Sequence, residues 1–168
     1  SFDTAGEAWD VIVTGNKAYV ADGDAGLVIL DVTNPATPTL LGTINPPGVQ
    51  KGVDVDRERM LAVLASGTAG IHVVNIANPT APVQVSGLPG GDVRDVALQG
   101  TFAFLADYSR SFTPVDLTNP AAPIAGPSTD VNLGGRLHDV AVQGNFALGA
   151  DVLFVNGVPI INIDAPAN

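Results

Sequence analysis

The sequence contains no cysteine among its 168 residues. Disulfides, zinc sites with thiolate ligands and cysteine nucleophiles are therefore excluded, and nothing in the sequence indicates a redox compartment. The sequence also lacks any apolar run close to the roughly 20 residues that a membrane-spanning helix requires. We therefore expect no membrane insertion.

Basic residues are scarce. Seven Lys and Arg stand against 17 Asp and Glu, of which 15 are Asp, and the net charge is -10. Such a chain repels phosphate backbones and anionic headgroups, so we expect no nucleic-acid partner. Asp-rich loops suit Ca²⁺, but Asp is also a common turn residue. A calcium cofactor and no cofactor at all both remain open.

Charged residues make up only 14% of the chain and aromatic residues 5%, whereas hydrophobic residues reach 46%. The 19 Gly and 13 Pro supply many turns, so the composition is typical of a folded, strand-rich protein. No stretch of 12 residues shows a period of about 3.6 without an interrupting Gly or Pro, which argues against helices.

A repeat runs through the whole chain. Asp-Val pairs recur with spacings of 44, 41 and 44 residues, at Asp10-Val11, Asp54-Val55, Asp95-Val96 and Asp139-Val140. An alanine follows each aspartate eleven residues later, at Ala21, Ala65, Ala106 and Ala150. Apolar segments then lead into an Asn-Pro pair three times, at Asn34-Pro35, Asn78-Pro79 and Asn119-Pro120. Each unit thus contains short β-branched segments separated by turn residues.

Four short strands in about 42 residues are typical of a β-propeller blade. We predict an all-β protein, a β-propeller of four repeats with four antiparallel strands per blade; part of a larger six- to eight-bladed ring and a β-solenoid are the alternatives. The repeats are expected at residues 7–49, 50–91, 92–135 and 136–168. Continuously apolar strands predict burial between blades, including that of Val11, Val13, Val28 and Val96.

Residues 7–49 resemble the LVIVD repeat family, with Leu27-Val28-Ile29-Leu30-Asp31 standing where the family name has its five letters. The resemblance covers essentially the whole chain. In the second repeat Arg57-Glu58-Arg59 replaces the turn Gly-Asn, and residues 152–157 form an irregular insertion; both are interpreted as binding loops or as drift. The resemblance implies an extracellular or cell-surface protein, in a family mostly without a defined biochemical role.

Residues 1–6 occupy the place of a fourth strand that the last repeat lacks. We therefore expect Phe2 to pair beside residues 160–163, in its own chain or in a partner's, because this would hide two strand edges. The chain would then be a monomer, or a homodimer formed by strand exchange. A ring of two chains and a fragment of a larger ring remain alternatives.

The aspartates of the repeat suggest a metal site. If the side chains of Asp10, Asp54, Asp95 and Asp139 converge near the axis, they could share a cation. The alternative is that each carboxylate bonds the turn before its own strand.

The residues that precede these aspartates are Trp9, Val53, Arg94 and His138. Equivalent positions would bring them to one mouth of the channel, where Trp9, Arg94 and His138 suit a small polar or anionic ligand. The alternative is a mouth lined by variable residues without a ligand.

No catalytic constellation stands out. His138 and Asp139 are adjacent strand residues that point to opposite faces, and Ser66, Ser109 and Ser111 lack a nucleophile-elbow context. His72 is interpreted as a core histidine. The loop from Asp22 to Gly26 is interpreted as a hairpin turn, with weak calcium binding as the alternative. We predict no catalytic residue, and enzymatic activity stays undecided.

Three functions follow from this architecture. The first is a non-catalytic cell-surface or secreted module for protein or glycan interaction. The second is a ligand- or metal-binding propeller, with or without enzymatic activity, that uses the channel mouth. The third is a structural repeat of the cell envelope.

Overall fold

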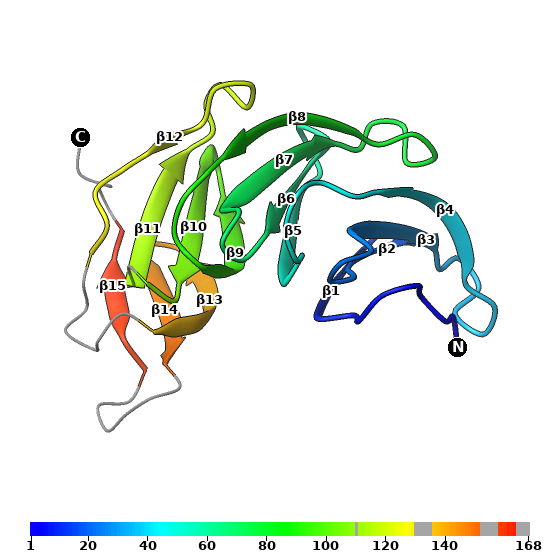
Figure 1. The fold of residues 1–168 in the computed structure, drawn as a ribbon, viewed down its shortest axis with the longest axis horizontal. Helices are drawn as coiled ribbons and strands as arrows, with labels where there is room; N and C mark the ends of the chain where they lie inside the picture. Colours follow the sequence, from blue (N-terminus) through cyan, green and yellow to red (C-terminus); the bar gives the residue numbers. More distant parts are fainter. Residues whose placement is uncertain (110, 130–135, 152–157, 164–168) are drawn as a thin grey trace.

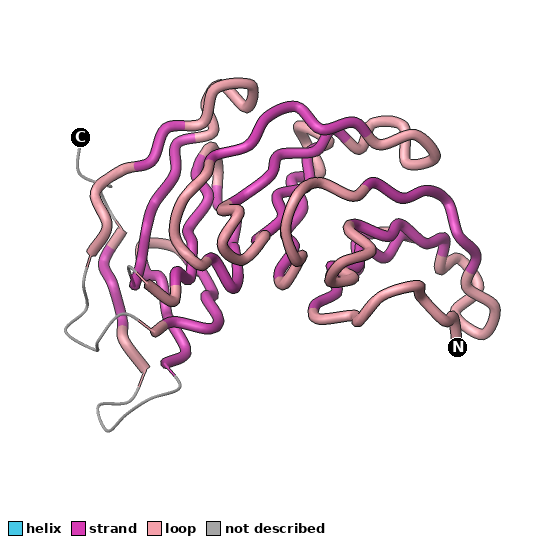
Figure 2. The backbone as a smooth tube through the Cα atoms, in the orientation of Figure 1, coloured by secondary structure: helices cyan, strands magenta, loops and turns pink. Residues whose placement is uncertain are grey.

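The computed structural model describes residues 1–109, 111–129, 136–151 and 158–163. The described residues form strands and loops and no helix (Figure 2), and accordingly none of them belongs to a helix that could cross a bilayer. The predictions for residues 152–157 and for the end of the fourth repeat lie outside the described residues.

The strands form four separate antiparallel sheets, or blades, each inside one predicted repeat. The first blade contains β1 (Asp10–Thr14), β2 (Lys17–Ala21), β3 (Leu27–Asp31) and β4 (Thr39–Ile44). The second contains β5 (Gly52–Asp56), β6 (Leu61–Ala65), β7 (Ile71–Asn75) and β8 (Val83–Leu88). The third contains β9 (Val93–Gln99), β10 (Phe102–Asp107), β11 (Ser111–Asp116) and β12 (Ile124–Ala125). The fourth contains β13 (Leu137–Gln143), β14 (Phe146–Asp151) and β15 (Ile160–Asn162).

The blades follow one another in an open arc (Figure 1), with the first and the fourth blade at its two ends. Consecutive strands are hydrogen-bonded neighbours in every sheet, so each blade is an up-and-down meander. The first strands of the blades, β1, β5, β9 and β13, are neighbours along the arc. The prediction of all-β propeller repeats is confirmed; the arc does not close on itself.

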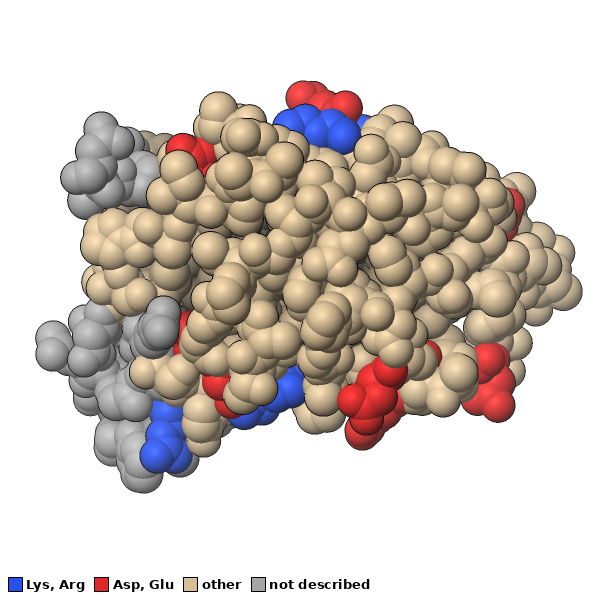
Figure 3. Space-filling view, turned by 45° about the horizontal axis from the view of Figure 1, so that its top comes forward, with Lys and Arg blue, Asp and Glu red and all other residues tan. Residues whose placement is uncertain are grey.

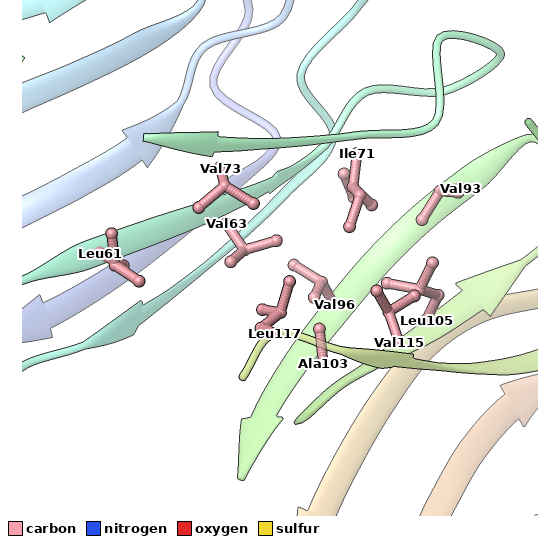
Figure 4. Packing of buried hydrophobic residues seen from close by; sticks show 11 residues of the cluster. Leu61, Val63, Ile71, Val73, Val93, Val96, Ala103, Leu105, Val115 and Leu117 are labelled. Atoms are coloured by element: carbon pink, nitrogen blue, oxygen red, sulfur yellow. The ribbon is translucent and has the colours of Figure 1, made fainter. Parts of the chain in front are cut away.

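The core lies between blades rather than within one. At the three junctions between blades, one face of a blade, its back face, packs on the front face of the following blade. Between the second and third blades, Leu61, Val63 and Val73 meet Val96 and Leu105 (Figure 4). Similar clusters join the first blade to the second and the third to the fourth. Stacking thus buries both sides of the inner blades, as their continuously apolar strands predict.

The Asn-Pro pairs form tight turns after the third strand, as predicted. The side-chain oxygens of Asn34, Asn78 and Asn119 each accept a hydrogen bond from the backbone N–H two residues later. The backbone carbonyls of the same residues accept from the N–H three residues later, at 3.0–3.1 Å. The fixed φ of proline suits the second position of such turns.

The burial prediction is correct for Val28 and Val96 and wrong for Val11 and Val13. Val11 is 56% exposed and Val13 is 61% exposed, whereas Val96 is 3% exposed. The reason is position in the arc: both valines lie on the front face of the first blade, where no preceding blade covers them.

Phe2 lies elsewhere than expected. Residues 1–9 form no strand, and Phe2 packs on the front face of its own blade, against Ala18, Val20, Val28 and Leu30. Asp22 fixes this segment by accepting hydrogen bonds from Thr4 Oγ1 at 2.7 Å and from the Gly6 N–H at 2.8 Å. Pairing of Phe2 with β15 of the same chain is therefore not found, and pairing with a second chain stays a prediction.

Candidate functional site at the inner ends of the blades

Aspartates at the start of the first strands join neighbouring blades. Asp10 accepts the N–H of Val11 at 2.7 Å through one carboxylate oxygen and the N–H of Val53, in the next blade, at 2.9 Å through the other. Asp54 bonds Val55 at 2.6 Å and Leu98 at 2.7 Å in the same way. Charge-assisted bonds of this kind are among the stronger ones in proteins. We call each such arrangement a carboxylate bridge.

Asp95 makes the third carboxylate bridge, accepting the N–H of Val140 in the fourth blade at 2.9 Å. Burial and, after it, the side-chain hydrogen bond between Asp95 and Asp139 raise the pKa of Asp95 to about 8. Asp95 is therefore protonated around neutral pH and can donate this hydrogen bond to Asp139. Burial also raises the pKa of Asp54, against two backbone hydrogen bonds that lower it.

These aspartates were expected to form a metal ring or to bond the turns before their own strands. The bridges follow a third pattern, in which the carboxylate bonds its own strand and the next blade. Among the residues that the structure describes, no three acidic or histidine side chains lie close enough together to hold a metal ion. Calcium binding by this protein stays a prediction.

The second blade departs from the register that the spacing of the repeats suggests. Asp10, Asp95 and Asp139 pair across their hairpins with Ala21, Ala106 and Ala150, but in the second blade Gly52 pairs with Ala65. The hairpin between β5 and β6 has four residues, 57–60, instead of two, which moves Asp54 two residues deeper into the strand. Lys51, and not Val53, therefore occupies the position equivalent to Trp9, Arg94 and His138.

The equivalent side chains converge on one cavity of about 200 Å³, which we call the mouth. The residues that line the mouth come from all four blades and are Trp9, Asp10, Lys51, Arg94, Asp95, His138 and Asp139. Trp9 is 52% exposed at its rim. The structure thus brings together the three predicted ligand-binding residues, and Val53 is instead buried between the first two blades.

Tyr108 organises the side of the mouth formed by the third and fourth blades, and sequence reasoning did not identify it. The guanidinium of Arg94 lies 4.7 Å from the centre of its ring, and that of Arg136 lies 5.4 Å away. The imidazole of His138 meets the same ring edge-on at 5.3 Å. The only sequence signal for Tyr108 is that it follows Asp107, the polar residue directly after the repeat alanine Ala106.

Charge at the mouth is nearly balanced. Asp92 pairs with Lys51 at 3.4 Å and also with Arg94. The Nε of Arg94 is buried and has no hydrogen-bond partner among the described residues. Basic side chains thus gather at the mouth, although the chain has only seven Lys and Arg. Charged side chains are also sparse on the face of the molecule seen in Figure 3.

Two further features singled out in the sequence, His72 and the loop after β2, take part in packing and in a turn. His72 is buried, its Nε2 lies 2.9 Å from the Pro47 carbonyl and its Nδ1 lies 3.0 Å from Gln84 Nε2. Burial lowers the pKa of His72, so the neutral ring bonds both groups, as expected for a core histidine. The turn from Asp22 to Gly26 is the predicted hairpin turn, closed by the Asp22 N–H donating to the Gly26 carbonyl at 2.8 Å.

The altered turn of the second repeat contributes to packing. Arg59 donates to the Leu117 carbonyl at 2.8 Å and to the Gly100 carbonyl at 3.0 Å, both in the third blade, and pairs with Asp56 of its own blade. Arg57 and Glu58 of the same turn line a second cavity of about 500 Å³ between the first two blades. That cavity lies at the opposite ends of the strands from the mouth.

The LVIVD repeat model matches residues 5–45, 90–130 and 134–168, which is more than half of the chain. The stretch between the first two matches, residues 46–89, contains the four strands of the second blade with its longer turn. No curated protein matches the chain.

Solved structures share the fold at low identity. The computationally designed Ika4 protein is 10% identical with a TM-score of 0.72, over 95% of this chain and 93% of that one. A functionally unknown protein from Desulfotomaculum acetoxidans DSM 771 is 15% identical with a TM-score of 0.75, over 99% of this chain and 55% of that one. The WD40 β-propeller domain of Doa1 is 15% identical with a TM-score of 0.63, over 89% and 49%.

The chain thus spans nearly all of one of these structures and about half of the other two. With the repeat matched over most of the sequence and the blades arranged as in solved propellers, this protein belongs to the LVIVD repeat family and is built of β-propeller blades.

Proposed function

We propose that this protein is a non-catalytic binding module that holds a sugar residue of a glycan at the mouth. The observation that carries the proposal is the convergence of Trp9, Lys51, Arg94 and His138, one from each blade, on a single cavity. Because each blade contributes one side chain, the site depends on the stacking of the repeats.

The chemistry of the mouth suits a sugar. An exposed indole offers a flat apolar face for the C–H face of a pyranose ring, and its N–H can donate a hydrogen bond. Arg94, Lys51 and the aspartates can bond hydroxyl groups from several directions, which provides orientation. A volume of about 200 Å³ admits one sugar unit and leaves the rest of a glycan outside.

The acid pair supports binding rather than hydrolysis. Glycosidases hold their two carboxyl groups about 5 Å or more apart, so that water or a covalent intermediate fits between them. Asp95 and Asp139 are in hydrogen-bond contact, and Asp95 is further engaged by the backbone of Val140. We assign no catalytic step to this pair. The extracellular location implied by the family resemblance forms part of the proposal, since glycans are abundant there.

Trp9 is the only tryptophan of the chain, so its fluorescence reports on the mouth alone. Titration with a panel of neutral and acidic monosaccharides and oligosaccharides should change the emission in a saturable way for at least one sugar. In calorimetry the Trp9→Ala variant should lose that binding, whereas Lys17→Ala, at the second cavity, should keep it. If no sugar changes the emission, or if Trp9→Ala binds as tightly as the parent, the proposal is wrong.

A further inference from the structure

The cavity of about 500 Å³ between the first two blades has no part in the proposed function. Its walls are the back face of the first blade and the front face of the second, and all strands of both blades are described. Its volume lies in the range of small-molecule sites, about 300–1,000 Å³. Residues that line it include Lys17, Tyr19, Val55, Arg57, Glu58 and Ile76.

Two departures from the repeat distinguish this junction, and the first is Lys17. By strand register, this first residue of β2 is equivalent to Leu61 of the second blade and Phe102 of the third. Leu61 packs against the third blade (Figure 4), and Phe102 packs against the fourth. A lysine therefore stands where the later junctions have an apolar side chain, and its ammonium donates to Asn16 of its own hairpin at 3.2 Å.

The second departure is the longer hairpin between β5 and β6, which places Arg57 opposite the first blade. Its Nη2 lies 3.9 Å from the position that a Cβ atom on Gly15 would take. Arg57 makes no ion pair or hydrogen bond with any described residue, although the chain has 17 acidic residues. A guanidinium of this kind can bind an anion through two parallel hydrogen bonds.

The surface beside Arg57 is apolar. Tyr19 and Ile76 are buried members of the cluster that joins the first two blades, and Val55 packs against that cluster. The Tyr19 hydroxyl makes no hydrogen bond with another described residue. Burial raises the pKa of Tyr19, and Arg57 is close enough to oppose that rise. A guanidinium, a phenol and an apolar surface thus face the same space.

Met60 adds an unusual backbone conformation at the edge of the cavity. Its φ of 53° is the only positive φ among the described residues other than glycine. This region favours glycine, and residues held in it are frequent at binding sites. The side chain of Met60 lines the cavity and is 49% exposed, so a bound molecule could cover it.

From these features we infer that the cavity between the first two blades binds a small carboxylate that carries an aromatic or branched apolar group. Arg57 binds the carboxylate with its planar fork, and the apolar group lies against Tyr19 and Ile76. Lys17 and Arg57 against Glu58 give the lining a net charge of +1, which matches a singly charged carboxylate better than a doubly charged phosphate. The site is separate from the mouth and does not depend on sugar binding there.

NMR titration of the backbone amide signals tests the inference with three probes, phenylacetate, naphthylacetate and isovalerate. At least one should shift the signals of residues 15–17 and 57–60 in a saturable way. Acetate, which lacks the apolar group, and the uncharged amide of the binding probe should each bind at least about 10-fold more weakly, because hydrogen bonds between charged groups contribute about that factor. Phenyl phosphate should bind no more tightly than phenylacetate.

Two variants address the residues of the cavity. Arg57→Ala should weaken binding of the tightest probe at least about 10-fold. Lys17→Phe supplies the side chain that the third blade has at this position, so it should fill the cavity and abolish the shifts. Arg136→Ala removes the same charge beside Tyr108, at the opposite ends of the strands, and is the matched control. It should bind like the parent.

Several results would overturn the inference. They are no saturable shift with any of the three probes, equal binding of acetate or of the uncharged amide, tighter binding of phenyl phosphate, and binding by Arg57→Ala or Lys17→Phe as tight as that of the parent. Sugar binding at the mouth is followed through Trp9 fluorescence, so its success or failure is read separately.

Discussion

At the scale of single residues, the carboxylate bridges use one side chain to satisfy backbone groups of two blades. Adjacent first strands are not paired with each other in a sheet, so some N–H groups face the neighbouring blade without a strand partner. An aspartate is short and accepts several hydrogen bonds, which suits this narrow gap. The cost is the partial burial of a carboxyl group, and Asp95 offsets that cost by remaining protonated around neutral pH.

The proton that Asp95 holds in the folded state makes stability depend on pH. The folded state holds a proton on Asp95 up to a pKa of about 8, whereas an unfolded aspartate has a pKa of about 3.9. The folded state therefore binds more protons than the unfolded state between these values, and the free energy of unfolding should fall as the pH rises from about 4 to about 8. In Asp139→Asn the pKa of Asp95 should fall, and this contribution to the pH dependence should shrink.

Urea unfolding at a series of pH values measures this contribution as the difference between the variant and the parent. Asp24→Asn, which removes an exposed carboxylate from the loop after β2, serves as the control for the change in net charge. The account of the acid pair fails if Asp139→Asn and Asp24→Asn show the same pH dependence.

At the scale of single elements, the turn between β5 and β6 replaces a two-residue hairpin by one that contacts the next blade. Arg59→Ala removes hydrogen bonds to two carbonyl groups of the third blade and the pair with Asp56. We expect a loss of about 1–3 kcal/mol in the free energy of unfolding, because hydrogen bonds from a charged group contribute about that much. Lysine lacks the planar fork of arginine and should not restore it.

Chemical denaturation of Arg59→Ala, Arg59→Lys and Arg57→Ala gives the comparison. Arg57 is exposed in the same turn, and its replacement should cost less than about 0.5 kcal/mol. Equal losses for Arg57→Ala and Arg59→Ala would show that the contacts with the third blade do not matter.

The strands and the Asn-Pro turns were predictable because each depends on local sequence that recurs in every repeat. The position of Lys51 at the mouth was not predictable. Asp54 and Ala65 keep the same spacing as the landmarks of the other repeats, so the spacing hides that the hairpin has two additional residues and that Gly52, not Asp54, pairs with Ala65. Trp9, Arg94 and His138 were found because the three other hairpins have equal length. Burial of Val11 was wrongly predicted because a repeat pattern describes an average blade with two neighbours.

At the scale of the whole molecule, stability should vary along the arc. The second and third blades are covered on both faces, whereas the first and fourth each expose a face, and in repeat proteins stability is approximately a sum of unit and neighbour contributions. In dilute solution, hydrogen exchange should therefore be slowest in β6 and β10 and faster in β1 and β14. Exchange at one rate in all four blades would contradict this gradient.

The carboxylate bridges also bear on how such a chain can change its length during evolution. The first three blades each carry an aspartate directed to the following blade, and the last three each supply a backbone N–H group to the preceding one. Duplication of one unit in the gene therefore brings a ready-made interface on either side, with no compensating substitution elsewhere. Deletion of one unit likewise joins two compatible blades. Selection can thus adjust the number of blades in whole steps, while the residues before each aspartate diversify independently.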